Sequence, residues 1–179
     1  MKYISRILRT GAVRKTPEKI IQRILTEINP NDDAHILEFG AGNGEISQPL
    51  ACSLTRHNIS YFAFEIDPVF SKQLQSLLPN IHVVSKDAFE FEKSIPAGFM
   101  ADFIISSMPL SFYPKPNLLR FLQKMRNRLN EKGKIIILFH AFWLIPLFRK
   151  QFRSCHIHRF NTLPPYFLLV FTHKAMSGK

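Results

Sequence analysis

The sequence predicts an α/β domain with a mostly parallel, Rossmann-like sheet. Short apolar runs alternate with longer amphipathic segments from residue 34 onward, which is the pattern of repeated strand-helix units. A glycine-rich loop follows the first of these runs directly and leads into a helical segment. The chain has 179 residues and 46% hydrophobic content, so we expect one buried core and no second folded domain.

The apolar runs give the expected strands, and the amphipathic segments give the expected helices. Strands are predicted at 35–39, 59–65, 81–84, 102–106, 134–139, about 156–161 and about 166–173, the last two as a hairpin. Helices are predicted at about 16–29, 45–56, 68–78, 116–129 and 144–152, with an irregular link around 89–95. We expect Thr16 to cap the first helix and Asp67, which precedes Pro68, to cap the third.

Residues 1–15 are predicted to form a short basic amphipathic helix and a connector ahead of the main domain at 16–179. Apolar residues recur at helical spacing in 3–8, while Lys2, Arg6 and Arg9 occupy the other face. Such a helix could bind an anionic membrane surface through both apolar insertion and charge. It could equally pack its apolar face on the core and close a ligand pocket.

The chain is strongly basic. Lys and Arg outnumber Asp and Glu by 24 to 13, and the formal net charge is +11, which indicates a polyanionic partner or an anionic membrane surface. A late basic group could hold a lipid phosphate or an RNA backbone. Its members are Arg149, Lys150, Arg153 and Arg159.

Several other classes of protein are disfavoured. The two cysteines, Cys52 and Cys155, lie far apart, so we expect no disulfide framework and a reducing cytosolic compartment. The longest apolar stretch, 135–148, is too short to span a bilayer. We also expect no metal site, because strand alternation separates Cys155 from His156 and His158.

The loop at 38–44 is predicted to bind a cofactor. Its glycines allow positive φ angles and a close approach of the backbone to a ligand. Glu38 at the strand end could contact a cationic cofactor directly or through water, whereas a dinucleotide fingerprint opens with glycine. The residues expected to bind are Glu38, Gly40, Ala41, Gly42 and Gly44.

Two later acids follow the next two strands. Glu65 lies roughly 20 residues beyond the loop, at a spacing where a carboxylate can accept from both hydroxyls of a ribose. Ile66 could then pack on an adenine face, while Asp87 could accept from the adenine amino group beside the backbone of Ala88. The alternatives are local: Glu65 could cap a helix, and Asp87 could make a turn.

This ordered set resembles the class I S-adenosylmethionine-dependent methyltransferases over about residues 16–174. The resemblance implies a Rossmann-like methyltransferase sheet that ends in an antiparallel hairpin. It also implies S-adenosylmethionine as cofactor and S-adenosylhomocysteine as product.

The end of the fourth strand should lie beside the transferable methyl group. Amino methyltransferases of nucleic acid bases have Asn or Asp there, then one residue, Pro and an aromatic that stacks on the base. This chain has Ser107 and Leu110 in those places. We expect Ser106 to contact the cofactor and Ser107 to take part in catalysis.

The segment 106–111, Ser-Ser-Met-Pro-Leu-Ser, instead resembles the bacterial phospholipid N-methyltransferases, which are related in sequence to the rRNA adenine dimethyltransferases. Segments 8–13 and 161–166 agree. The resemblance implies stepwise methylation of phosphatidylethanolamine towards phosphatidylcholine by a cytosolic protein held peripherally at the inner membrane face. An RNA or other nucleic-acid adenine methyltransferase is the alternative, and a non-catalytic cofactor-binding module is a third reading. We expect a monomer.

A methyl group on a sulfonium already has a good leaving group, so the enzyme must mainly align an uncharged amine. His140, after the fifth strand, is a candidate base, with water as the alternative. Tyr113 could orient the amine. His140 could instead be a packed residue, and Tyr113 a pocket wall.

Overall fold

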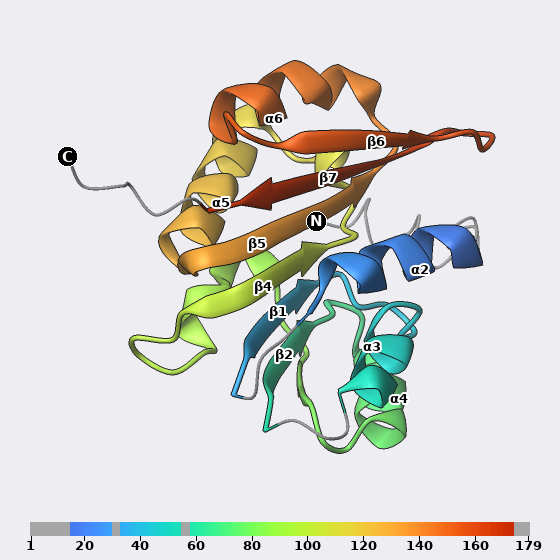
Figure 1. Ribbon diagram of the computed structural model, residues 1–179. Coiled ribbons are helices and arrows are strands. Elements are labelled where there is room, and N and C mark those ends of the chain that lie inside the picture. The colour runs from blue at the N-terminus through green and yellow to red at the C-terminus, as the bar shows by residue number, and fades with distance from the viewer. Residues whose placement is uncertain (1–14, 30–32, 55–57, 174–179) are drawn as a thin grey trace.

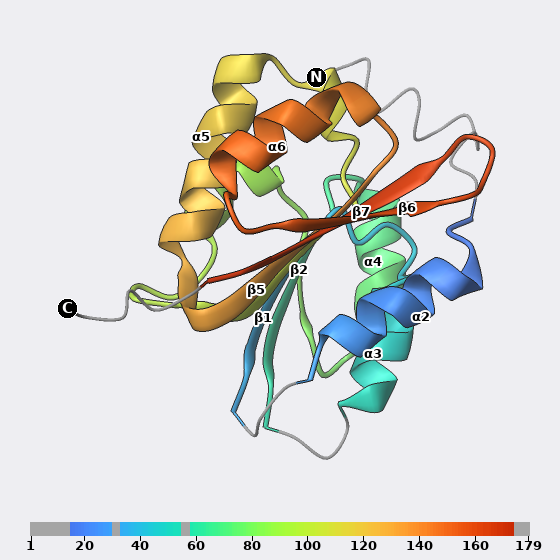
Figure 2. The same ribbon diagram turned by 45° about the horizontal axis from the view of Figure 1, so that its top comes forward.

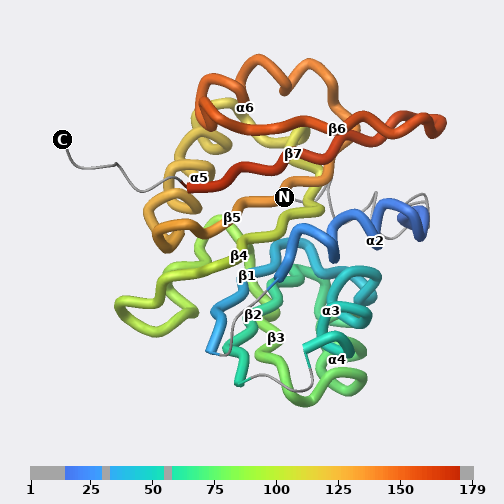
Figure 3. The backbone as a smooth tube through the Cα atoms, viewed as in Figure 1, coloured from blue at the N-terminus to red at the C-terminus, as the bar shows by residue number. Residues whose placement is uncertain are grey.

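A seven-stranded sheet runs through the middle of the structure in the order β3-β2-β1-β4-β5-β7-β6 (Figures 1 and 3). The computed structural model describes residues 15–29, 33–54 and 58–173. The first five strands pair in parallel, and β7 lies antiparallel between β5 and β6. The predicted mostly parallel sheet with a C-terminal antiparallel pair is therefore confirmed.

The strands are β1 (His35–Phe39), β2 (Ser60–Phe64), β3 (His82–Val84), β4 (Ala101–Ser106), β5 (Leu129–Phe139), β6 (His156–Phe160) and β7 (Tyr166–Thr172). The α-helices are α2 (Glu18–Glu27), α3 (Ser47–Ser53), α4 (Pro68–Leu77), α5 (Lys115–Asn127) and α6 (Ile145–Gln151). Three short 3-10 helices are η1 (Ala88–Lys93), η2 (Leu110–Phe112) and η3 (Phe142–Leu144). Every strand and helix predicted within the described residues is present.

Helices cover both faces of the sheet (Figure 2). One core lies between the sheet and α5 and α6, and the other lies between the sheet and α2, α3 and α4. Residues of β1 alternate between them, since Leu37 and Phe39 join the first core and Ile36 joins the second. Burial on both faces explains why the parallel strands read as continuous apolar runs.

The two edges of the sheet have different roles. Because β1 to β5 are parallel, their carboxyl ends meet along one edge, which we call the carboxyl edge; the opposite one is the amino edge. The chain leaves β1 towards β2 on one side, and β4 adds to β1 on the other. Open parallel sheets bind ligands at the carboxyl edge near such a switch point.

Two predicted starts are wrong. Pro17, not Thr16, occupies the N-cap position of α2 and makes no side-chain cap bond, since proline has no side-chain acceptor. The Thr16 amide donates to Glu45 Oε2 at 2.9 Å. β5 begins at Leu129 rather than 134, since pairing of Ala101 with Leu129 extends the strand across a register shift. The prediction for Asp67 is confirmed, because its side chain accepts from the amides of Val69 and Phe70.

The predicted N-terminal helix, with Lys2, Arg6 and Arg9, lies outside the described residues, as does the whole of the 8–13 match. Within the described ranges, no helix is both long enough and apolar enough to cross a membrane.

Candidate functional site

The glycine loop turns sharply at the carboxyl end of β1. Gly40 has φ 80°, and its amide donates to Phe64 O at 2.9 Å, so the loop is tied to the end of β2. A Cβ at Gly40 would lie 2.8 Å from Met108 Cγ and 3.2 Å from Met108 N. The loop and the segment after β4 therefore approach too closely for any side chain at Gly40.

Gly42 differs from Gly40 in what lies around it. It also has a positive φ, 56°, yet a Cβ built there would meet no atom within 4 Å. Glycine is favoured by the backbone angle rather than by crowding. The space beside Gly42 is open, as a ligand resting on the loop requires.

Glu65 joins this loop to the end of β2. Its Oε2 accepts from the Gly42 amide and its Oε1 accepts from the Asp67 amide, both at 2.8 Å. The side chain is buried, and burial raises the pKa of Glu65 above its ordinary value, although the backbone hydrogen bonds oppose the shift. A carboxylate has about four acceptor positions, so two bonds leave capacity for the hydroxyls of a ligand.

Tyr113 lies in the same corner as Glu65 and Asp87. Burial, followed by the neighbouring charges of Asp87 and Glu65, raises the pKa of Tyr113 to about 12. Its ring packs on Phe89 with centroids 4.3 Å apart. Tyr113 thus keeps its proton at neutral pH and can donate a hydrogen bond, but it cannot act as the base.

The remaining adenine-site predictions fall nearby. Ile66 is 45% exposed at the end of β2, and Ala88 is buried at the start of η1. Asp87 caps η1, with its Oδ1 accepting from the Phe89 amide at 2.9 Å. The local turn role considered for Asp87 is therefore present, and its second oxygen is the one that could serve a ligand.

Glu38 lies beneath the loop rather than on it. It has no exposed surface, and its Oε2 accepts from Ser47 Oγ at 2.6 Å and from the Tyr61 hydroxyl. The carboxylate is enclosed and ties α3 and β2 to β1, while its Oε1 has no hydrogen-bond partner among the described residues. The predicted contact of Glu38 with a cofactor, directly or through water, stays a prediction. Burial raises the pKa of Glu38, against the opposing effect of its two hydrogen bonds.

Tyr61→Phe is expected to lower the free energy of unfolding by about 1–3 kcal/mol, since it removes a donor from a buried carboxyl group. The raised pKa means that the folded protein holds this proton more tightly than the unfolded chain. Stability therefore falls as pH rises from the ordinary value of 4.5 towards the raised value. Loss of the Tyr61 bond should raise the pKa of Glu38 further and widen that window.

Urea unfolding at several pH values measures this effect. In a Glu38→Gln background, Tyr61→Phe should lose most of its pH dependence, because the titrating group is gone. An equal loss of stability at every pH in the single variant would contradict the assignment.

The segment after β4 divides between buried and accessible groups. Ser106 is fully buried, and its hydroxyl has no partner among the described residues. The predicted contact of Ser106 with the cofactor stays a prediction. Ser107 donates through Oγ to Gly40 O at 2.8 Å. That bond uses the only hydroxyl proton of Ser107, so its Oγ can take part in further hydrogen bonds only as an acceptor. Leu110 is buried and offers no stacking surface.

His140 lies exposed at the carboxyl edge after β5. Its Nδ1 is 2.8 Å from Pro165 O, and its ring packs on Tyr166 at 3.8 Å between centroids. A carbonyl oxygen only accepts, so Nδ1 carries the proton and Nε2 is the basic nitrogen of the neutral ring. The structure thus shows the packed position considered for His140 and also leaves it a nitrogen suited to a base.

The late basic group is divided between the two edges. Arg159 pairs with Phe167, which lies opposite Phe139 at the carboxyl edge. Arg153 lines a pocket with Phe171, which lies opposite Ile135, so the two sites are roughly 13 Å apart along β7. Arg149 is on α6, close enough to the Cys155 thiol to oppose the rise in its pKa that burial causes. One phosphate cannot engage the whole group.

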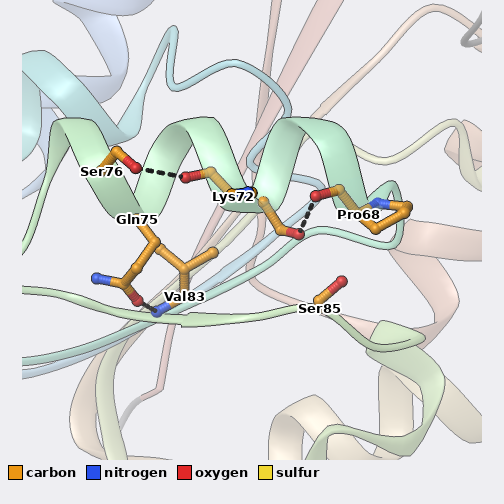
Figure 4. Close-up of a pocket in the computed structure, with 7 residues that line it drawn as sticks. Pro68, Lys72, Gln75, Ser76, Val83 and Ser85 are labelled. Atoms are coloured by element: carbon orange, nitrogen blue, oxygen red, sulfur yellow. Dashed lines mark hydrogen bonds between the residues drawn. The ribbon is translucent and has the colours of Figure 1, made fainter.

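A second pocket, of about 390 Å³, lies between α4 and β3 and involves none of the predicted site residues (Figure 4). It is lined by Pro68, Ser71, Lys72, Gln75, Ser76, Val83 and Ser85. Gln75 spans it, accepting from the Val83 amide at 3.1 Å. In the described part of the chain, no group of three His, Cys, Asp or Glu side chains is placed to hold a metal.

Comparison with known proteins agrees with this geometry. The family model for ribosomal RNA adenine dimethylase matches residues 15–99, which include the glycine loop, Glu65 and Asp87. A search of curated proteins finds no significant match. Three solved structures illustrate the likeness in fold.

The TehB-like S-adenosylmethionine-dependent methyltransferase from Corynebacterium glutamicum is 18% identical, with a TM-score of 0.65 over 97% of each chain. An rRNA methylase from Streptococcus thermophilus is 15% identical, with a TM-score of 0.66 over 91% of this chain and 100% of its own. The T. thermophilus 16S rRNA N2 G1207 methyltransferase, solved with its cofactor and guanosine, is 18% identical, with a TM-score of 0.69 over 92% of this chain and 45% of its own.

The residues at the carboxyl edge fit S-adenosylmethionine. The open space beside Gly42 can admit it, Glu65 has spare acceptor capacity for ribose hydroxyls, and Ile66 offers an exposed apolar face. When bound, this cofactor supplies a methyl group activated by a sulfonium. The fold, the match of residues 15–99 to the ribosomal RNA adenine dimethylase model and this site together support S-adenosylmethionine-dependent methyltransferase activity.

Proposed function

We propose that this methyltransferase acts on the amine of phosphatidylethanolamine, stepwise towards phosphatidylcholine, at an anionic membrane surface. The observation that carries the proposal is an apolar rim at the carboxyl edge. It consists of Phe112, Phe142, Trp143 and Leu163, which are between 54% and 86% exposed. Exposed apolar groups gathered in this way mark protein or membrane contact sites.

The rim lies at the edge of the sheet where the glycine loop ends β1. Phe112 follows β4, Phe142 and Trp143 follow β5, and Leu163 lies in the turn before β7, so all three segments are at the carboxyl edge. Aromatic side chains suit the boundary between lipid tails and headgroups. Arg159 at the same edge adds a cation for an anionic surface.

The cofactor would be held by the glycine loop and by residues that follow β2 and β3. The amides and open side of 40–44 would carry its amino-acid portion, while Glu65 would accept from the ribose hydroxyls. Ile66 and Asp87 would contact the adenine, beside the backbone of Ala88.

The acceptor would be positioned by Ser107, Tyr113 and His140. An ammonium group must lose a proton before its nitrogen can attack a methyl group. We assign proton removal to Nε2 of His140, since Nδ1 is held by Pro165 O. Ser107 Oγ would accept a hydrogen bond from the amine and Tyr113 would line the pocket as a protonated phenol, an arrangement that aligns the nitrogen.

RNA adenine methylation is the second candidate, favoured by the match to ribosomal RNA adenine dimethylase over 15–99. Against it stands Leu110, which is buried where base methyltransferases place a stacking aromatic. Exposed Phe112 could supply a stacking surface instead, so the acceptor has to be tested directly.

The protein supplied with methyl-labelled cofactor should label vesicles of phosphatidylethanolamine and phosphatidylglycerol, and should leave unmodified rRNA unlabelled. A Phe142→Ser, Trp143→Ser variant is expected to lose about tenfold or more in vesicle binding and lipid methylation, because two apolar contacts with the bilayer are removed. Its cofactor affinity should be unchanged.

Leu77→Ser is the matched control, since Leu77 is also exposed, at 49%, but lies at the end of α4 away from the rim. It should bind and methylate vesicles as the unaltered protein does. Label in RNA but not in lipid would overturn the proposed acceptor without affecting the assignment of the cofactor.

A further inference from the structure

A basic pocket of about 430 Å³ lies at the amino edge, away from the glycine loop and the apolar rim. It is lined by Arg126, Lys150, Gln151, Arg153, Ser154 and Phe171. Arg126 and Lys150 belong to the last turns of α5 and α6, and Phe171 lies near the end of β7. Both helices run back from the carboxyl edge, so their ends converge at the amino edge.

Arg126 gives the pocket a defined wall. Its Nη1 donates to Gln151 O at 3.1 Å, which joins the end of α5 to the end of α6. Phe171 is almost fully buried and packs on Phe152 with centroids 5.1 Å apart, which makes a firm apolar floor. Arg126 and Lys150 are therefore carried on helix ends, and Arg153 follows the end of α6.

The positive charge of the pocket is not balanced by the acids that the structure describes. Glu92 pairs with the neighbouring Lys124 and Arg128, at 3.3 Å each. Over residues 15–29, 33–54 and 58–173, no ion pair is found for Arg126, Lys150 or Arg153. Three like charges around one cavity repel each other, and a bound anion relieves that repulsion.

We propose that this pocket binds the phosphate group of a small soluble ligand, at a site separate from methyl transfer. The free ends of Arg153 and Lys150 can donate charge-assisted hydrogen bonds to phosphate oxygens, and the Ser154 hydroxyl can add a neutral one. The inference does not depend on which acceptor the enzyme methylates.

Shape and surroundings favour a soluble phosphate over a lipid headgroup. Stable attachment to a bilayer needs apolar insertion as well as charge, and no large exposed apolar residue that the structure describes lines this pocket. The apolar rim lies at the opposite edge of the sheet. A protein seated on a membrane through that rim would turn this pocket towards water.

Titration of the full-length protein with pyrophosphate, followed by calorimetry, tests the proposal. Saturable binding is expected, and Lys150→Gln with Arg153→Gln should weaken it about tenfold or more. The control is Lys19→Gln with Lys72→Gln, which removes the same two charges from exposed positions on α2 and α4. It should bind pyrophosphate as the unaltered protein does.

Cofactor affinity should be equal in the unaltered protein, the pocket variant and the control variant. Equal affinity would show that both variants are folded. Equal loss of pyrophosphate binding in the control would overturn the proposal, because net charge alone would then explain it. Unchanged binding in the pocket variant would overturn it as well. The protein could instead bind phosphatidic acid vesicles through Lys150 and Arg153 and fail to bind pyrophosphate. That result would overturn the proposal that the phosphate belongs to a soluble ligand.

Discussion

Gly42→Asp is expected to fold normally and to lose S-adenosylmethionine binding by at least about a hundredfold, or about 2.7 kcal/mol. The backbone at Gly42 has φ 56°, which Asp tolerates better than most residues, and the new Cβ would meet no protein atom within 4 Å. The side chain would occupy the open space that the cofactor needs. It would also bring a second carboxylate next to Glu65.

Gly98→Asp is a closely matched control. Gly98 has φ 77°, and a Cβ there would likewise meet nothing within 4 Å. Both variants therefore carry the same added charge and similar backbone strain, but only Gly42 lies in the loop. Calorimetric binding and thermal unfolding distinguish the outcomes: unchanged cofactor affinity in Gly42→Asp would remove the loop from the site.

Glu65→Ala is expected to have the second large effect, again a loss of about a hundredfold in cofactor affinity. The variant removes the acceptor for the Gly42 and Asp67 amides as well as the proposed acceptor for the ribose. Hydrogen bonds to a charged group contribute about 1.5–3 kcal/mol each. Glu65→Gln keeps one acceptor oxygen and should lose less.

Asp67→Ala is the control for Glu65→Ala. Asp67 caps α4, so its loss should cost about 0.5–2 kcal/mol of stability and leave cofactor affinity unchanged. A cofactor loss as large in Asp67→Ala as in Glu65→Ala would show that the effect passes through α4 instead.

The pKa of Glu65 adds a pH test. Burial raises this pKa above 4.5, so the carboxylate takes up its proton earlier than usual as pH falls. Affinity for the cofactor should therefore fall as pH falls through that raised value, and Glu65→Gln should show much less of this dependence. Equal pH dependence in the two proteins would contradict the ribose role.

Sequence reasoning was most reliable where the signal is local. Hydrophobic periodicity and turn chemistry predicted β1 at 35–39, and the Asp67-Pro68 pair predicted the cap of α4. Each of these features depends on a few neighbouring residues. The glycine loop, Glu65 and Asp87 each follow a strand of the parallel sheet. Their common location at the carboxyl edge therefore follows from one rule, that parallel strands end at the same edge.

The site was less predictable where distant residues meet. Tyr61 and Ser47 carry no motif, and they reach Glu38 only because the β1–β2 register and the docking of α3 place them there. The same packing encloses the Glu38 carboxylate. Helix α2 begins one residue later than the predicted cap requires, so Pro17 rather than Thr16 stands at its N-cap position.

The sequence by itself determined the parallel sheet and the glycine loop, since these follow from short-range periodicity and turn chemistry. The class of cofactor followed from the resemblance of the ordered motifs to a known family. Only the tertiary structure decided which basic side chains lie together. Arg153 and Arg159 are six positions apart in sequence, but they lie at opposite edges of the sheet, because the strand β6 separates its two ends by its own length. Sequence proximity cannot tell one basic site from two when an extended strand lies between them.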